Sequence, residues 1–170
     1  EGDAYRLRWF TPKMEVDLCG HATLASAWTL FNKLGFAEDE VRFDTRSGRL
    51  TVRRDGDALV MDFPASRPEP MGCLPTEIVA AVGGKPEAAF RTPGGIGFVM
   101  LVYGRGDDVA ALTPDFTALA KVHPGGVAAT APGDGYDFVS RLFAPAKGID
   151  EDPVTGSSHC VLAPYWAGRL

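Results

Sequence analysis

Two short segments of the chain place small, acidic and hydroxyl-bearing residues just ahead of an apolar, helix-like run. The first contains Gly20 and His21, and the second contains Asp152, Gly156 and Ser157. A glycine at a helix start leaves the free backbone N–H groups open to a ligand, and the helix dipole favours an anion there. Two such ends facing one cleft would hold a carboxylate and stabilise a developing enolate. The same glycines would also serve as plain turn residues.

Each polar side chain in these segments has a chemical and a structural interpretation. A neutral imidazole at His21 could relay a proton, or the ring could cap or pack the helix. Asp152 could orient a histidine or a substrate amine, or it could be an acidic turn residue beside Pro153. Ser157 could donate from its hydroxyl and its N–H, or act only as a helix cap. The residues alone leave both interpretations open.

The cysteines point to a reducing compartment. Cys19, Cys73 and Cys160 form no even framework and no Cys-x-x-Cys pair, so we expect no disulfide scaffold. A zinc site built from Cys19 and Cys160 with His21 and His159 is disfavoured, because neither pair has the usual ligand spacing. We interpret Cys73 and Cys160 as buried, unreactive thiols.

The two segments form an internal echo. Asp17 stands three residues before Gly20, and Asp152 stands four residues before Gly156. This pattern suggests two lobes of similar plan, each presenting a helix amino terminus. A two-thiol racemase would need cysteines at equivalent places in both segments, but the residue before Gly156 is Thr155.

Alternating and apolar runs around these segments indicate an α+β fold with antiparallel sheets around buried helices. The patterns predict helices at 20–31, 75–82, 113–121 and 157–166, and strands at 5–11, 41–45, 49–54, 58–63, 98–103 and 136–143. The first helix is apolar almost all round, so we expect it to be buried on most sides. The third should have Thr113 as its cap and Pro114 at its first position, and the last should be interrupted at Pro164.

The Pro-rich stretch Pro64–Gly72 predicts a boundary between two lobes, which we place at residues 1–66 and 67–170. We see no signal peptide at the start and expect a cytoplasmic protein.

Composition excludes several classes of function. The chain has 170 residues, 45% apolar and 23% charged, an ordinary globular balance. Its net charge is −5, and an acidic chain without a basic run is a poor candidate for binding nucleic acid. No apolar run approaches the ~20 residues of a membrane span, so we expect no membrane partner.

Four segments together resemble the phenazine-biosynthesis PhzF-like family. The two long motifs run from Phe10 to Ala25 and from Asp150 to Ser157, and the shorter ones are Asp62–Ala65 and Ala163–Trp166. They occur in order over essentially the whole chain. The resemblance implies a diaminopimelate-epimerase-like fold with two related lobes. Each lobe would be a barrel-like, mostly antiparallel sheet around a central helix, with the active site in the cleft between them.

The resemblance also implies an activity, since the family's best-understood reaction is a cofactor-free proton shift in a hydroxylated dihydroanthranilate. Position by position, it makes His21, Asp152 and Ser157 catalytic, and Gly20, His21, Gly156 and Ser157 substrate-binding. We therefore expect an isomerase that moves a proton in a small carboxylate, with no metal or organic cofactor. We also expect a homodimer, because unpaired strand edges promote association.

Two departures from the family pattern keep alternatives open. Relatives that racemise or epimerise amino acids use two cysteines; Cys19 matches the first, but Thr155 stands at the second, which disfavours this reaction. The family's main acid–base glutamate lies in a Ser-Glu-x-x-Phe segment upstream of the strand at 5–11, and neither Glu1 nor Glu15 has that context. We expect a longer protein that carries this glutamate and further strands of the second lobe. A non-catalytic small-acid-binding protein on the same scaffold is the remaining alternative.

Overall fold

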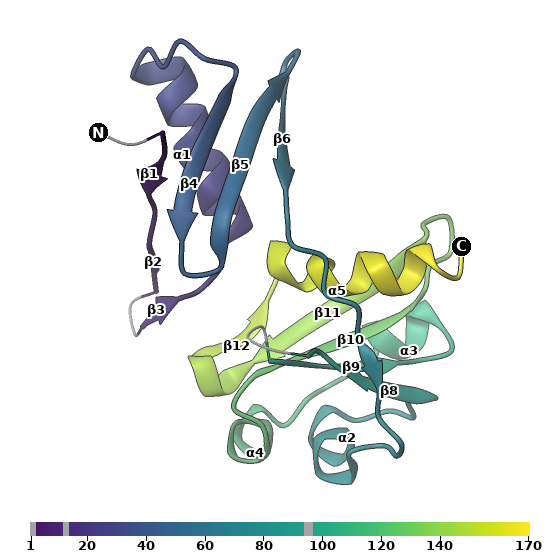
Figure 1. Ribbon diagram of the computed structural model, residues 1–170. Coiled ribbons are helices and arrows are strands. Elements are labelled where there is room, and N and C mark those ends of the chain that lie inside the picture. The colour runs from purple at the N-terminus through teal and green to yellow at the C-terminus, as the bar shows by residue number, and fades with distance from the viewer. Residues whose placement is uncertain (1–2, 12–13, 94–96) are drawn as a thin grey trace. The chain divides into compact units, whose positions relative to one another are not determined.

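The computed structural model describes residues 3–11, 14–93 and 97–170, and its fold is α+β. The chain separates into two compact units, residues 1–64 and 65–170 (Figure 1). Within the described ranges, no helix combines the length and apolar character needed to cross a membrane.

The first unit is a four-stranded sheet with one long helix. Its elements in chain order are β1 (Tyr5–Arg6), β2 (Trp9–Phe10), β3 (Glu15–Val16), α1 (Gly20–Lys33), β4 (Glu40–Thr45), β5 (Gly48–Asp55) and β6 (Ala58–Asp62). The sheet order is β1-β4-β5-β6, with β1 parallel to β4 and the other pairs antiparallel. The strand predicted at 5–11 is wrong as a single element, because β1 pairs with β4 whereas β2 pairs with β3.

Helix α1 covers one face of this sheet. Val41 and Phe43 alternate along β4 toward the helix, because successive side chains of a strand point to opposite faces. Ala27 and Phe31, four residues apart on α1, complete the core. The opposite side of α1 is exposed, and Trp28 keeps 48% of its surface accessible. Burial on most sides is therefore wrong for α1 in the described part of the chain.

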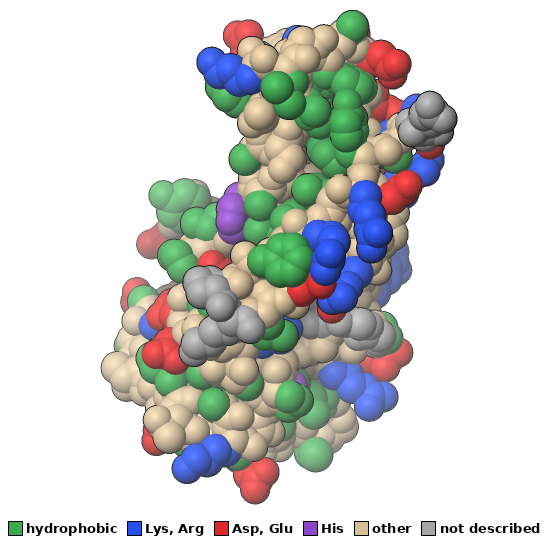
Figure 2. All heavy atoms as spheres, turned by 90° about the vertical axis from the view of Figure 1, so that its left-hand side faces the viewer, with side chains coloured by type: hydrophobic (Ala, Val, Ile, Leu, Met, Phe, Trp, Pro, Cys, Tyr) green, Lys and Arg blue, Asp and Glu red, His purple; other side chains and the backbone are tan. Residues whose placement is uncertain are grey.

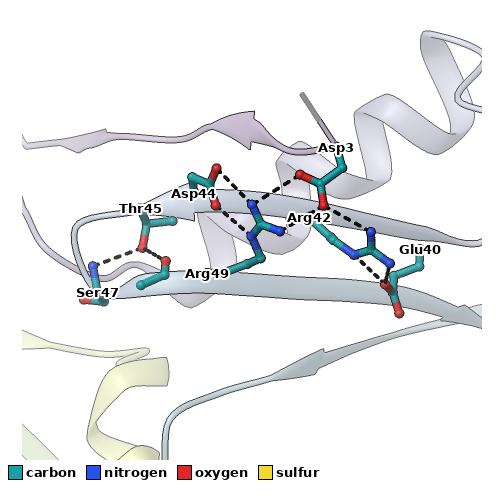
Figure 3. Close-up of polar contacts among 8 residues, drawn as sticks. Asp3, Glu40, Arg42, Asp44, Thr45, Ser47 and Arg49 are labelled. Carbon is teal, nitrogen blue, oxygen red and sulfur yellow. Dashed lines mark hydrogen bonds and ion pairs between the residues drawn. The ribbon is translucent and has the colours of Figure 1, made fainter. Parts of the chain in front are cut away.

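The other face of the sheet carries paired charges. Asp3 accepts hydrogen bonds from Arg49 and Arg42, Arg49 also binds Asp44, and Arg42 also binds Glu40 (Figure 3). On the face of the molecule in Figure 2, acidic side chains likewise lie among basic ones. Water screens such exposed pairs, so they contribute little to stability.

The second unit is a six-stranded sheet with helices on both faces (Figure 1). Its elements are β7 (Glu69–Pro70), α2 (Thr76–Val82), β8 (Ala88–Arg91), β9 (Phe98–Val102), α3 (Gly106–Ala110), α4 (Phe116–Val122), β10 (Gly126–Pro132), β11 (Phe138–Ala144), the 3₁₀ turn η1 (Pro145–Lys147), β12 (Ile149–Asp152) and α5 (Gly156–Ala167). The strand order is β12-β11-β10-β9-β8-β7, and among the described pairs of this sheet only β9 and β10 are parallel.

Alternation along β9 and β10 divides the core of this unit into two layers. Val99 and Leu101 face α2, α3 and α4, whereas Phe98, Met100 and Val102 face α5. The apolar side chains of α5 that fill the second layer are Val161, Leu162, Tyr165 and Trp166. Helix α5 is therefore anchored on the sheet over most of its length.

Two details of the predicted helices are wrong. Helix α5 runs unbroken through Pro164, and the Ser66 N–H donates to the Cys160 carbonyl at 2.8 Å. That donor replaces the N–H that proline lacks, so the carbonyl stays paired. Helix α4 starts at Phe116, because Asp115 is the cap and accepts a hydrogen bond from Ala118 N at 2.9 Å.

Neither sheet closes into a barrel within the described residues. β1 and β6 are the edges of the first sheet, and β12 and β7 are the edges of the second. The barrel-like form implied by the resemblance is thus absent from the described strands. What each unit presents instead is an open, mostly antiparallel sheet with a helix, α1 or α5, packed on one face.

Candidate active site

The first candidate segment lies at the start of α1. Cys19 is the N-cap residue with extended backbone, and its side chain does not cap the helix. The N–H and the hydroxyl of Thr23 both donate to the Cys19 carbonyl, at 3.2 and 2.7 Å. The N–H groups of Gly20 and His21 precede this first helical bond, so helix geometry leaves them without an acceptor.

His21 is exposed beside the Cys19 thiol. The Cys19 Sγ atom lies 3.6 Å from Nε2 and 3.8 Å from Nδ1 of the imidazole. An exposed ring does not fill the core, so the packing interpretation of His21 is wrong. The side chain is accessible to a ligand at the helix start.

The structure gives Gly20 a packing role of its own. A Cβ atom at this position would lie 2.8 Å from Cζ of Phe63 and 3.6 Å from Cε of Met61. Because glycine has no Cβ, the Phe63 ring, which follows β6, can lie against the helix start, and a larger residue at position 20 would require that ring to move. This packing role does not depend on a ligand.

The second candidate segment joins β12 to α5. Asp152 ends β12 opposite Leu142, and its Oδ1 atom accepts a hydrogen bond from the N–H of Val154 at 3.1 Å. The carboxylate therefore already holds the turn, as the structural interpretation of Asp152 requires. Thr155 is the N-cap of α5 without a side-chain cap, so the first-turn N–H groups of Gly156 and Ser157 have no intrahelical acceptor.

The two neighbouring serines differ in what their hydroxyls do. The Ser158 hydroxyl is buried and donates to the Thr155 carbonyl at 2.8 Å. The Ser157 hydroxyl is half-buried and makes no hydrogen bond within the part of the chain that the structure describes. Ser157 is thus the serine of this turn that is available to a ligand.

The structure groups the predicted residues within each unit. Gly20 and His21 lie together at the start of α1, and Asp152, Gly156 and Ser157 lie together ahead of and within the first turn of α5. That both groups face one cleft stays a prediction.

Of the two cysteines predicted to be buried, one is buried and the other is exposed. Cys160 is buried, which confirms that part of the prediction, and burial raises the pKa of its thiol, which favours an unreactive group. Cys73 is exposed, so its predicted burial is wrong. Among residues 3–11, 14–93 and 97–170, no three His, Cys, Asp or Glu side chains gather as metal ligands would.

Two ion pairs ahead of the helix starts were not predicted from the sequence. Arg8 binds both carboxylate oxygens of Glu15, each at 2.8 Å, and Arg141 binds those of Glu151 at 2.7 and 2.8 Å. The guanidinium hydrogen bonds lower the pKa of each glutamate. The available signal was spacing, since each glutamate stands five residues before the glycine that begins its helix.

Comparison with known proteins gives one consistent family. The PhzC-PhzF family model, described as phenazine biosynthesis-like protein, matches residues 1–170. Two uncharacterized isomerases of Pseudomonas aeruginosa are 53% and 48% identical over 170 residues, which is 100% of this chain. The chain spans 63% and 64% of the length of these two relatives.

A solved structure agrees with the sequence comparisons. The crystal structure of a phenazine biosynthesis protein of the PhzF family from Enterococcus faecalis is 47% identical, with a TM-score of 0.85. The match covers 99% of this chain and 64% of that one.

Proposed function

The chain belongs to the PhzC-PhzF family of phenazine biosynthesis-like proteins, and we propose that it is the greater part of an isomerase that moves a proton in a small carboxylate. The observation that carries this proposal is the pair of uncapped helix starts. One offers an exposed imidazole at His21, and the other offers the Asp152 carboxylate and the Ser157 hydroxyl. The names of the two bacterial relatives support an isomerase at this coarse level.

In the proposed reaction, the substrate loses a proton either from the carbon next to its carboxylate or from a carbon of a conjugated diene. The negative charge that develops needs donors fixed in advance, and one such donor is worth about 3–4 kcal/mol in acyl-transfer enzymes. The N–H groups of Gly20, His21, Gly156 and Ser157 supply those donors, together with the positive ends of the two helix dipoles. His21 and Asp152 hold and polarise the substrate.

The proton itself needs an acid–base group. The resemblance assigns it to a glutamate in a segment upstream of these residues. We propose that no metal or organic cofactor takes part, because the donors and acid–base groups named here suffice for a proton shift. The same donors on a scaffold without the glutamate would bind small acids and leave them unchanged.

Solvent deuterium exchange separates these two functions. The protein is expressed in its natural full-length reading frame, and candidate acids are incubated with it in D₂O: a hydroxylated dihydroanthranilate, and amino acids for the epimerase alternative. An isomerase exchanges a carbon-bound hydrogen of the first acid for deuterium, as mass spectrometry detects. Binding of these acids without any exchange would establish the non-catalytic alternative.

A further inference from the structure

A matched set of side chains stands before each candidate helix start. In the first unit, Phe10 of β2 pairs with Glu15 of β3, and Arg8 lies two residues before Phe10. Arg8 binds the carboxylate of Glu15 with two nitrogens, and its guanidinium carbon lies 4.9 Å from the centre of the Phe10 ring. Arg46, in the turn between β4 and β5, binds the same carboxylate at 2.9 Å.

The second unit repeats this arrangement. Phe143 of β11 pairs with Glu151 of β12, and Arg141 lies two residues before Phe143. Arg141 binds Glu151 with two nitrogens, and its guanidinium carbon lies 5.0 Å from the centre of the Phe143 ring. Its third nitrogen donates to the carbonyls at the end of α3, namely those of Val109, Ala110 and Leu112.

The shared register corrects the echo seen in the sequence. Both glutamates, Glu15 and Glu151, stand five residues before their helix-start glycine, so they are the equivalent positions. Val16 then matches Asp152, and Asp17 has no acidic counterpart. The one-residue mismatch between the two acidic residues disappears, because those residues were never equivalent.

We propose that the Arg8–Glu15 and Arg141–Glu151 pairs are positioning residues that fix the two helix starts for substrate; this rests on the proposed function. We name them the first and second brace. Their bidentate geometry sets direction as well as distance, which single-point ion pairs do not. Each brace also ties its short strand to another element of the same unit, the β4–β5 turn or the end of α3.

The braces lie where strand pairing is sparse. β3 has two residues and β12 has four, so their ladders supply few hydrogen bonds to hold the chain that leads into the helix. The side chain of Glu15 is only 12% exposed although Arg8 is 48% exposed, and the Arg141–Glu151 pair is 25% and 35% exposed, so both pairs are partly shielded from water. If either glutamate moved, the segment of the chain between it and the helix-start glycine would move too, and the N–H groups proposed to bind the substrate would lose their positions.

Backbone amide exchange with D₂O tests the braces without any need for activity. The full-length protein is compared with its Glu15→Gln and Glu151→Gln variants, which keep side-chain size but remove the charge. Glu15→Gln should speed exchange of the Thr23 N–H, the first hydrogen-bonded amide in the first turn of α1, at least about tenfold, and should leave the Ser158 N–H in the first turn of α5 unchanged. Glu151→Gln should do the reverse. Glu40→Gln, which removes an exposed pair with Arg42, is the matched control and should change neither turn.

Turnover supplies the second readout. Each brace variant should lower kcat at least about fivefold with a smaller change in KM, because donors that stabilise the developing charge lose their alignment. Arg8→Lys keeps the positive charge but cannot bind both carboxylate oxygens as the guanidinium does. Its kcat should therefore lie between that of the unsubstituted protein and that of Arg8→Met. Unchanged exchange in both turns, or a uniform rise across the whole unit, overturns the positioning role. If the unsubstituted protein shows no turnover, the proposed function fails, and the exchange result still decides the braces.

Discussion

His21 and Cys19 lie side by side at the start of α1, yet the proposed chemistry gives them unequal roles. His21→Ala and Asp152→Ala should each slow turnover at least about tenfold, because each removes a group that holds or polarises the substrate; Asp152→Ala also removes the acceptor of the Val154 N–H in the turn before α5. Cys19→Ser should cost much less, since Thr155 stands where a second thiol would be required. Deuterium wash-in on one substrate measures all three variants.

The opposite pattern would identify a different reaction. If Cys19→Ser abolishes wash-in while Asp152→Ala leaves it unchanged, the proton is moved by a thiol and the isomerase assignment is wrong. Alkylation of a Cys73→Ser variant provides an independent check, because the exposed Cys73 would also react and a thiol-dependent enzyme loses activity when Cys19 is modified. Cys160 is buried and should react slowly under the same conditions.

The braces also predict how stability depends on pH. The pKa values of Glu15 and Glu151 are lowered in the folded protein, chiefly by hydrogen bonds from Arg8 and Arg141. A lowered pKa adds stability above the unfolded-state value, about 4.3 for glutamate, and that stability is lost as pH falls through the folded-state value.

Urea unfolding between pH 3 and pH 7 measures this effect. The free energy of unfolding of the unsubstituted protein should fall more steeply below about pH 4.3 than that of the Glu15→Gln/Glu151→Gln variant. Parallel curves for the two proteins would mean that neither pair contributes to acid sensitivity.

The candidate site residues were predictable from sequence where they belong to a local motif. The types and positions of His21, Asp152 and Ser157 come directly from two motifs, and the structure leaves His21 and Ser157 accessible at helix starts. Glu15 and Glu151 were not predicted, because their role depends on arginines across a strand pair. The exposure of Cys73 likewise depends on loop packing that no local pattern encodes.

At the start of α1, the glycine has both a packing and a ligand interpretation. Gly20→Ala would place a methyl group 2.8 Å from Phe63, and such overpacking costs typically about 1–3 kcal/mol. The double variant Gly20→Ala/Phe63→Leu should recover most of that stability, because the shorter side chain withdraws. Chemical denaturation of both variants and of Phe63→Leu measures the recovery.

Turnover then separates the two interpretations of Gly20. If packing alone requires the glycine, the double variant regains activity together with stability. If the added methyl group also blocks the substrate, stability returns but activity does not. Full stability in the single Gly20→Ala variant would mean that the Phe63 ring moves aside at little cost and that packing does not require the glycine.

Elements with clear periodicity were predictable, and those defined by tertiary partners were not. β4, β5 and β9 follow alternating or continuous apolar runs, so their existence and type were expected. β10, rich in Gly and Ala, has weak strand propensity and is held by β9 and β11 on either side. The continuity of α5 through Pro164 depends on the Ser66 N–H, almost one hundred residues away.

The molecule as a whole is predicted to use both helix starts on one substrate. The similarity of the two units supports this. In each unit, a strand that carries the glutamate of a brace leads into a helix that begins with glycine and has no side-chain cap. A carboxylate has two oxygens and accepts several hydrogen bonds, so it can be shared between two sets of N–H donors. A single binding event should then affect both helices.

Anthranilate, a stable aromatic carboxylate, provides the test in the full-length protein. Its addition should slow amide exchange at Gly20 and His21 and at Gly156 and Ser157 together, with the same midpoint concentration, because one bound molecule covers all four donors. The N–H of Ala118, already bonded to the Asp115 side chain, should not respond and serves as the internal control. Protection of one helix alone, or two different midpoints, would show that the helix starts bind separately and that the shared site is wrong.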